Sequence, residues 1–242
     1  MNLGVKFELF FEYLKTPKWQ QLLLSGILTT IQIAVFGLII GIIVGMLIAV
    51  IKVSPKYKLI MRILDKVCDC YIAIFRGTPM VVQLLISYYV ILPLLGLTSI
   101  EPINVGICVF GLNSGAYVAE IMRGGINSVD KGQLEAGRAV GLSYTTAMLK
   151  IVIPQAIKNI VPMLGNEFII LIKETSVVSF ITVYDLYTVL YNIATNSYDF
   201  MVPFIFMALI YIVMVLLITL LIKLVEKIFA KNERKTVIKK TK

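Results

Sequence analysis

The stretch Asp130–Gln155, DKGQLEAGRAVGLSYTTAMLKIVIPQ, decides the fold, because it is polar and long apolar segments lie on both sides of it. In such a chain a polar stretch must lie outside the hydrocarbon of a membrane. Residues 132–140 and 143–150 are each predicted to form a short helix, with Gly141 in a left-handed turn and Ser143 capping the second helix. We call residues 130–155 the elbow. Its small residues leave surface depressions that a partner protein could fill: Ala136, Gly137, Ala139 and Gly141.

The composition of the chain indicates an integral membrane protein. Of its 242 residues 59% are hydrophobic and 15% are charged, and the mean hydropathy is +0.90. A soluble domain of this length could not bury so much apolar surface. Basic loops on one side of a membrane explain the net charge of +9 without nucleic acid binding. The three cysteines lie in apolar segments and the chain has no histidine, so neither a disulfide nor a metal site is predicted.

Apolar segments predict an all-α membrane protein with five transmembrane helices. The first span carries Gly37, Gly41 and Gly45 at every fourth position, a spacing that lets another helix approach one face closely. The second span is interrupted by Gly77 and Pro79, which are predicted to break the helix. The predicted spans cover residues 19–52, 67–95, 103–122, from about 161 onward, and 200–224.

Both ends of the chain are predicted to lie outside the spans. Within residues 1–18, apolar residues recur at helical spacing from Phe7 to Leu14, which predicts an interfacial helix and lacks the pattern of a signal peptide. Residues 231–242 are predicted to form a basic cytoplasmic tail. The transmembrane domain, including the elbow, is therefore expected over residues 19–230.

The distribution of Lys and Arg orients the predicted spans. Five of these residues follow the first span, five lie in and around the elbow and eight lie within residues 223–242, whereas the two intervening loops carry none. The positive-inside rule places basic loops in the cytoplasm. We therefore expect the elbow and the C-terminus in the cytoplasm and, with five spans, the N-terminus outside.

Four motifs support a more specific interpretation of the chain. They are FRGTP at residues 75–79, AYVAEIMRGGINSV at 116–129, Glu135-Ala136-Gly137 followed by Gly141, and LGNEFIILIKETSVVSFI at 164–181. Together they resemble the permease subunits of bacterial ABC importers, in the polar amino acid branch that takes histidine, glutamine and arginine. The resemblance covers residues 19–226. One departure is Ala73, where relatives often carry an acidic residue.

This resemblance implies the type I importer permease fold and a dimer of permease subunits, each inserting its elbow into a groove on a separate ATPase subunit. An extracytoplasmic solute-binding protein would deliver the substrate. The chain has no GxxxxGKS or GxxxxGKT phosphate loop, so ATP and Mg²⁺ are expected on the ATPase, and this chain is expected to be a transport subunit without catalysis or cofactor. On composition alone, the elbow could also be a solvated connector. The implied coupling residues are Glu135, Ala136, Gly137, Gly141 and Pro154.

Ionisable residues at membrane depth are costly to bury, so each indicates a functional or paired role. Asp69 and Arg76 lie seven residues apart on one helix face. Arg76 suits the carboxylate of an amino acid substrate, and Asp69 suits its ammonium group. Alternatively, Arg76 caps the broken backbone at FRGTP and Asp69 lies near the basic loop at the membrane surface. Glu120 and Arg123, three residues apart, are predicted to pair with each other.

Five further residues are candidates for the substrate site. Asn113, Ser114 and Tyr117 cluster in the third span, where they would either contact substrate or form hydrogen bonds between helices. Asn166 and Glu167 lie in the fourth span. A lone carboxylate in an apolar segment either binds a cation or stays protonated, and we favour binding for Glu167.

The acidic residues Asp69 and Glu167 favour a cationic substrate such as arginine, lysine or histidine, although Ala73 weakens that preference. The predicted function is therefore the transmembrane subunit of an ATP-driven importer of polar, preferentially basic, amino acids in the bacterial inner membrane. An importer of glutamine or another neutral polar amino acid is the first alternative. A passive channel would not need the elbow, and a membrane enzyme would need a nucleophile with a base, or metal ligands, that this chain does not offer.

Overall fold

The computed structural model describes the backbone of residues 2–240 and the side chains of residues 2–227, and all regular elements in the described part are helical. The predicted tail, residues 231–242, therefore lies outside the residues whose side chains are described. The α-helices are α1 (Leu3–Lys15), α2 (Pro17–Val53), α3 (Leu59–Gly77), α4 (Met80–Ile86), α5 (Leu92–Leu94), α6 (Pro102–Asn127), α7 (Lys131–Ala139), α8 (Tyr144–Ala147), α9 (Ile153–Glu174), α10 (Leu186–Ser197) and α11 (Met201–Lys240). Three other helical segments join them: the π-helices η1 (Ser87–Ile91) and η2 (Met148–Val152) and the 3₁₀-helix η3 (Thr175–Ile181).

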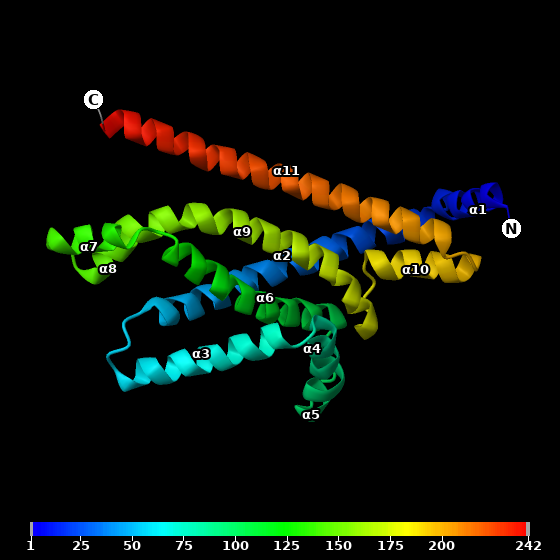
Figure 1. Cartoon of the computed structure of the whole chain (residues 1–242). Helices are drawn as coiled ribbons and strands as arrows, with labels where there is room; N and C mark the ends of the chain where they lie inside the picture. Colours follow the sequence, from blue (N-terminus) through cyan, green and yellow to red (C-terminus); the bar gives the residue numbers. More distant parts are fainter. Residues whose placement is uncertain (1, 241–242) are drawn as a thin grey trace.

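The long helices run side by side, with α7 and α8 at one end and α1 and α10 at the other (Figure 1). Four helical segments are long and apolar enough to cross a membrane: Pro17–Val53, Pro102–Asn127, Tyr144–Ile181 and Met201–Lys227. A fifth crossing results if Leu59–Gly77 and Met80–Leu94, which meet at an angle of 106°, count as one broken span. The all-α, multi-span architecture predicted from the apolar segments is confirmed.

The glycine face of α2 packs directly on α6. A Cβ atom at Gly41 would lie 2.7 Å from the Ser114 Oγ, and one at Gly45 would lie 2.6 Å from the Val118 Cγ1. In return, Ile40 of α2 fits against Gly111 of α6. Because the absence of side chains on both helices allows this approach, the predicted packing face is confirmed.

The predicted helix break after Gly77 is also confirmed, but the segment before it is more helical than expected. The chain turns at Thr78 and Pro79, where the axis changes by 106° between α3 and α4. However, α3 begins at Leu59, so Arg62 and Lys66 lie on a helix. The prediction that the second span starts at residue 67 was therefore wrong, because the charged residues of this segment stand on one face of an amphipathic helix.

The elbow has the predicted two-helix form. Gly141 adopts φ +88° after α7, and the Ser143 Oγ accepts a hydrogen bond from the Thr146 N–H at 3.2 Å. Gly137 is buried, and a Cβ there would lie 2.8 Å from the Ile151 Cδ1. Ile151 of the elbow therefore already occupies the surface depression predicted at Gly137.

The elbow is continuous with the fourth span. Helix α8 passes through η2 into α9 without a break, and the helical segment extends from Tyr144 to Ile181. The helix that carries the predicted fourth span therefore begins before residue 161, the predicted start of the span. Pro154 is the second residue of α9 and directly follows the π-helix η2, so its missing N–H falls at an irregular turn inside this continuous helix. A displacement of α8 is thus transmitted along the same helix into the interior.

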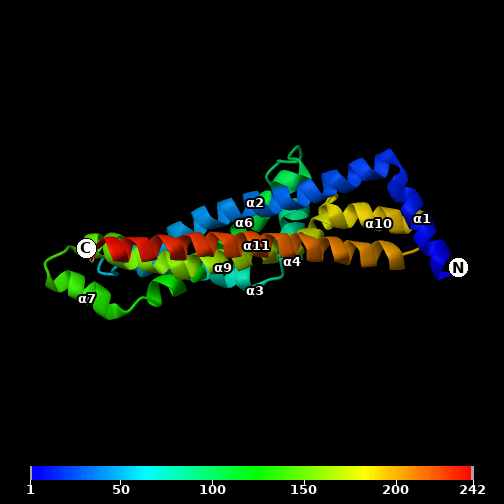
Figure 2. The same ribbon diagram turned by 90° about the horizontal axis from the view of Figure 1, so that it is seen from above.

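The N-terminal helix α1 packs against α10 and α11 at the far end of the molecule (Figure 2). Phe10 is 2% exposed, and its ring lies 5.1 Å from that of Phe206. The Lys6 Nζ lies 2.7 Å from the Asp199 Oδ1, and Tyr13 contacts Trp19 edge to face. Protein contacts therefore hold the buried face of this helix.

We predict that the contact between α1 and α10 weakens in acid. The hydrogen bond from Lys6 holds the pKa of the Asp199 carboxyl below its ordinary value. A depressed folded pKa stabilises the contact above the ordinary aspartate value, and this contribution is lost as pH falls through the lower folded value. The emission of Trp19, the single tryptophan of the chain, should change below about pH 4. In Asp199→Asn this acid transition should disappear; a transition at the same pH in that variant would contradict the assignment.

Candidate functional site

A carboxylate lies buried among the spanning helices. Glu167 of α9 is 5% exposed, and its Oε1 accepts a hydrogen bond of 2.9 Å from the Ser114 Oγ of α6. Gly41 of α2 provides the space for this hydroxyl, as described above. Among residues 2–227, no ion pair includes Glu167. A buried carboxylate without a cation is costly, so the site is electrostatically suited to a positively charged ligand.

The break between α3 and α4 is held by two amide side chains. The Gln83 Nε2 donates to the Phe75 and Thr78 carbonyl oxygens at 2.8 and 3.0 Å. The Asn113 Nδ2 donates to the Gln83 Oε1 at 2.9 Å and to the Phe75 carbonyl at 3.2 Å. Gln83 and Asn113 therefore satisfy the broken backbone, and the alternative interpretation of Arg76 as its cap was wrong. Gln83 was not among the predicted site residues, although a glutamine four residues after Pro79 in an apolar segment could have indicated a polar contact at the helix break.

Arg76 is left in a partly open position. Its side chain is 43% exposed, its guanidinium carbon lies 5.3 Å from the centroid of the Tyr117 ring, and its Nη1 lies 3.7 Å from the Glu120 Oε2. The same Glu120 oxygen pairs more closely with Arg123, at 2.6 Å, which confirms the predicted Glu120–Arg123 pair. A loosely paired guanidinium against an aromatic face remains able to take a carboxylate.

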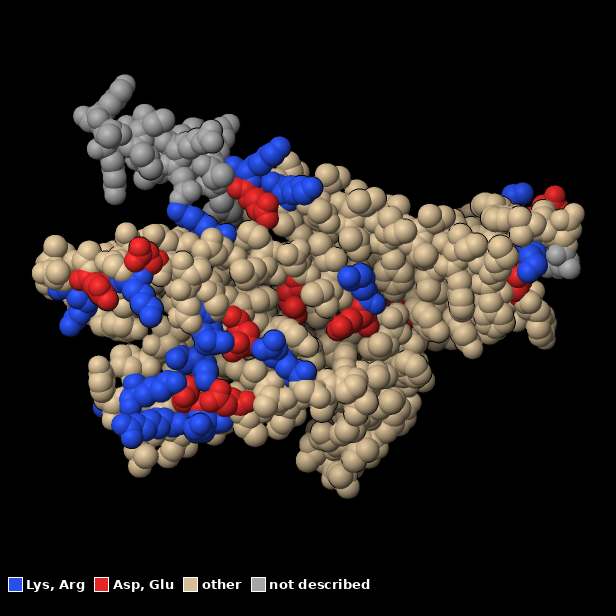
Figure 3. Space-filling view, in the orientation of Figure 1, with Lys and Arg blue, Asp and Glu red and all other residues tan. Residues whose placement is uncertain are grey.

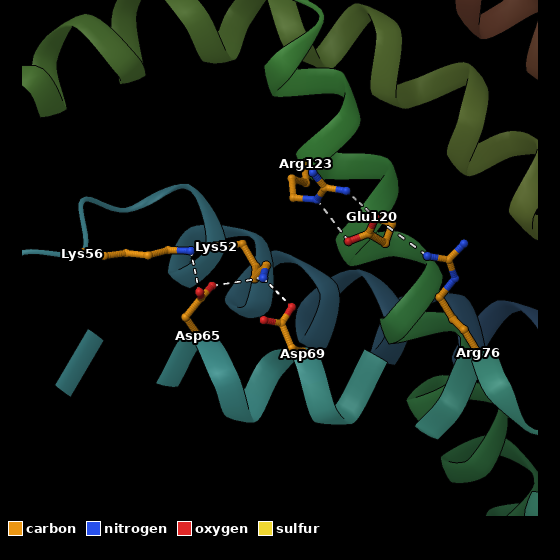
Figure 4. A network of polar contacts seen from close by, with 7 residues as sticks. All are labelled: Lys52, Lys56, Asp65, Asp69, Arg76, Glu120 and Arg123. Carbon is orange, nitrogen blue, oxygen red and sulfur yellow. Dashed lines mark hydrogen bonds and ion pairs between the residues drawn. The ribbon is translucent and has the colours of Figure 1, made fainter. Parts of the chain in front are cut away.

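Asp69 belongs to a separate ionic network, shown in Figure 4. The Lys52 Nζ lies 2.6 Å from the Asp69 Oδ1 and 3.1 Å from the Asp65 Oδ1, and the Lys56 Nζ lies 2.5 Å from the Asp65 Oδ2. Asp69 thus pairs with Lys52 in the last turn of α2, next to the basic loop, which supports the alternative interpretation of this residue. Although Asp69 and Arg76 lie on the same helix, they point toward different partners (Figure 4).

Beside this network, a cavity of about 800 Å³ lies between the elbow, the C-terminal ends of α2 and α6, and the middle of α3. We call it the elbow-end cavity. Asp69 lines it, whereas Arg76 and Glu167 do not, so the structure does not bring Asp69 and Glu167 into one cavity. Its polar lining includes Lys52, Asp69, Glu120, Arg123, Lys131, Glu135 and Tyr144.

Three other candidate residues stand on exposed positions. Asn166 is exposed on α9, next to the buried Glu167, and Glu135 and Ala136 are exposed on α7. The two α7 residues are thus accessible to a partner protein, in contrast to the buried Gly137. The sequence analysis passed over Glu174, which lies seven residues after Glu167 and therefore on the same face of α9, about 10 Å further along the axis.

We predict that Gln83→Leu raises the KM for the transported substrate about tenfold. The substitution removes the amide N–H groups that bind the Phe75 and Thr78 carbonyl oxygens and the amide oxygen that accepts from Asn113, so the helix break next to Arg76 loses its support. The maximal uptake rate should change less than the KM. Gln20→Leu, at an exposed position of α2, is the matched control and should leave the KM unchanged. A KM for Gln83→Leu equal to that of the unaltered protein would show that Gln83 does not position the site.

Long apolar helices with a few buried polar side chains between them, and an ordered elbow at one end, are the architecture of the membrane-spanning subunit of a transport system. The chain belongs to the family described as binding-protein-dependent transport system inner membrane components, whose family model matches residues 37–231.

Several relatives are close to the chain along nearly their whole length. It is 39% identical over 211 residues to the arginine transport system permease protein ArtQ of Bacillus subtilis (strain 168), covering 87% of this chain and 94% of that protein. It is 39% identical over 218 residues to the putative glutamine transport system permease protein GlnP of Rickettsia bellii (strain RML369-C), covering 90% and 97%. A crystal structure of an amino acid ABC transporter with histidines matches with a TM-score of 0.79 at 40% identity, covering 89% and 97%. The chain is therefore a permease of an ABC importer for amino acids.

Proposed function

We propose that this permease imports basic amino acids, and that Glu167 selects them. The observation that carries the proposal is the burial of Glu167, 5% exposed, with a hydroxyl as its hydrogen-bond partner and no cation paired to it in the described chain. An ammonium or guanidinium group of the substrate would replace the Ser114 hydroxyl and neutralise the carboxylate. Glu174, on the same face of α9, would attract the same cation before or after that step.

In this proposal Arg76 and Glu167 have complementary roles. Arg76 binds the carboxylate that every α-amino acid carries, and Glu167 binds the positively charged side chain of a basic amino acid substrate. Tyr117 and Asn113 support the first contact, because Tyr117 lies under the guanidinium and Asn113 binds the backbone from which Arg76 projects. Ser114 holds Glu167 through its hydroxyl until a substrate cation takes that place. Asn166, exposed beside Glu167, stays a candidate for a polar contact with substrate.

The orientation is part of the proposal. Lys and Arg side chains gather at the end of the molecule that carries the elbow (Figure 3), and basic residues favour the cytoplasmic side of a cell membrane. The elbow and the C-terminus would then lie in the cytoplasm, and α1 would lie outside. The exposed Glu135 and Ala136 would dock on an ATPase subunit, while a second permease subunit and an external solute-binding protein complete the importer.

A neutral polar substrate is the second candidate. The relative from Rickettsia bellii is named as a putative glutamine permease, and the amides of Gln83 and Asn113 bind the carbonyl oxygen of Phe75, the residue before Arg76. In that case Glu167 would stay protonated and share its proton with Ser114.

Uptake by the reconstituted complex tests the proposal. Labelled arginine should enter proteoliposomes only with ATP inside and binding protein outside, and unlabelled lysine and histidine should compete more strongly than glutamine. The binding protein should also be tested for its own preference, so that its selectivity is separated from that of the permease. Flux without ATP would indicate a channel, and stronger competition by glutamine would favour the neutral substrate.

A further inference from the structure

A second polar site lies away from Arg76 and Glu167, in the elbow-end cavity. Its volume of about 800 Å³ is within the range of small-molecule sites, roughly 300–1,000 Å³. The elbow forms one wall, and the C-terminal ends of α2 and α6 with the middle of α3 form the other. Both walls carry charges of both signs, an arrangement that matches neither a simple anion site nor a simple cation site.

The cationic groups of the cavity retain unused donors. The Lys52 ammonium donates a hydrogen bond of 2.6 Å to the Asp69 Oδ1 and lies 3.1 Å from the Asp65 Oδ1 as an ion pair, so at least one of its three N–H groups has no acceptor among the described residues. The Arg123 Nε and Nη2 donate to Glu120 at 3.1 and 2.6 Å, which leaves Nη1 without a partner among the described residues. On the opposite wall Lys131 forms no ion pair in the described part of the chain. A carboxylate could therefore be bound without breaking an existing pair.

Acceptors for an ammonium group are also present. Asp69 accepts from Lys52 through Oδ1, so Oδ2 remains available, and its side chain is 48% exposed. Glu135 faces the same cavity from α7. Carboxylate-binding and ammonium-binding groups are thus combined in one space large enough for an amino acid.

We propose that the elbow-end cavity binds a free α-amino acid, as a second site on the side where substrate is released. The carboxylate binds Arg123, Lys52 and Lys131, and the ammonium group binds Asp69 and Glu135. This inference rests on the proposed function, since transport is what supplies amino acid to this side.

Occupation of the cavity affects the elbow directly. The Tyr144 hydroxyl donates to the Val53 carbonyl oxygen at 3.2 Å, a hydrogen bond that ties the elbow to the end of α2. A ligand bound between Glu135 and Asp69 adds a second tie, from α7 to α3. Because α8 continues into α9, a restrained elbow also restrains the helix that carries Glu167. Amino acid accumulated on the release side therefore slows further uptake.

The test uses the full importer in proteoliposomes loaded with ATP and increasing internal arginine, with labelled arginine and binding protein outside. Internal arginine should lower the initial uptake rate, and an equal concentration of internal sodium chloride should not. In Lys131→Gln and in Arg123→Gln, the internal arginine concentration that halves the rate should rise about tenfold. Arg62→Gln, a charged residue of α3 outside the cavity lining, should behave as the unaltered protein.

The outcomes separate this inference from the proposed function. Uptake that does not respond to internal arginine, or inhibition unchanged in both cavity variants, overturns the second site and leaves the import of basic amino acids standing. Absence of any ATP-driven uptake of basic amino acids overturns the proposed function instead. Lys131→Gln keeps the test decisive if Arg123→Gln does not fold, because Lys131 takes part in no ion pair of the described residues.

Discussion

Glu167→Gln is expected to lower arginine uptake about a hundredfold, the largest functional effect of any single substitution considered for this permease. Removing one partner of a buried charge pair costs about 3 kcal/mol or more, which corresponds to roughly two powers of ten in affinity. Glutamine has nearly the same volume as glutamate, so the packing between α6 and α9 is retained. The change therefore removes the charge and keeps the shape.

Ser114→Ala is the control for this substitution. It removes the hydroxyl that donates to Glu167 at 2.9 Å but keeps the carboxylate. Its effect on arginine uptake should be about tenfold or less, since it removes one hydrogen bond and no charge. Initial rates over a range of arginine concentrations would separate KM from maximal rate in both variants. Unchanged arginine uptake in Glu167→Gln would exclude Glu167 as the selecting group.

Gly45→Leu is expected to have the largest effect on folding. A Cβ at this position would lie 2.6 Å from the Val118 Cγ1 and 2.8 Å from the Ala119 backbone nitrogen. Because one of these neighbours is backbone, no side-chain rotation can relieve the contact, and α2 must move away from α6. Overpacking of this kind costs about 3 kcal/mol or more. The separation would also disturb Ser114, one turn earlier on the same face of α6.

Gly124→Leu is the matched control, because Gly124 lies in α6 with no atom within 4 Å of an added Cβ. After extraction in detergent and heating, the fraction of protein that still elutes as a single species should be strongly reduced for Gly45→Leu and nearly unchanged for Gly124→Leu. Because leucine favours a helix more than glycine does, helix propensity cannot cause a loss in either variant. Equal losses in the two variants would mean that a general effect of the added leucine side chain, and not contact with α6, causes the effect.

Local chemistry made several features predictable. Gly141 was expected in a left-handed turn because glycine has no Cβ, and Gly77 with Pro79 was expected to end a helix because proline lacks an N–H. The glycine spacing of α2 indicated its packing face for the same steric reason. The pairing of Glu120 with Arg123 followed from their separation of three residues on one helix.

Element boundaries were harder to predict where charge and hydrophobicity are mixed. Helix α3 starts at Leu59, among the basic residues, because it is amphipathic, with its charged residues on one face and its apolar residues on the other. The helix of the fourth span begins earlier than the apolar segment for a related reason: α8, η2 and α9 form one continuous helix, although hydropathy changes along it.

By itself, the amino-acid sequence determined the membrane-spanning helical class, the glycine face, the elbow and the family motifs, because each depends on residues close together in the chain. Only the tertiary structure decided the partners of the charged residues. It shows that Asp69 forms an ion pair with Lys52 and that Gln83 and Asn113 donate hydrogen bonds to the backbone at the helix break. It also shows that the buried Glu167 accepts a hydrogen bond from Ser114. Those contacts join residues up to 53 positions apart. The spacing of residues along one helix does not show which face of another helix they will contact. These partners could therefore be identified only from the packing of α2, α3, α6 and α9.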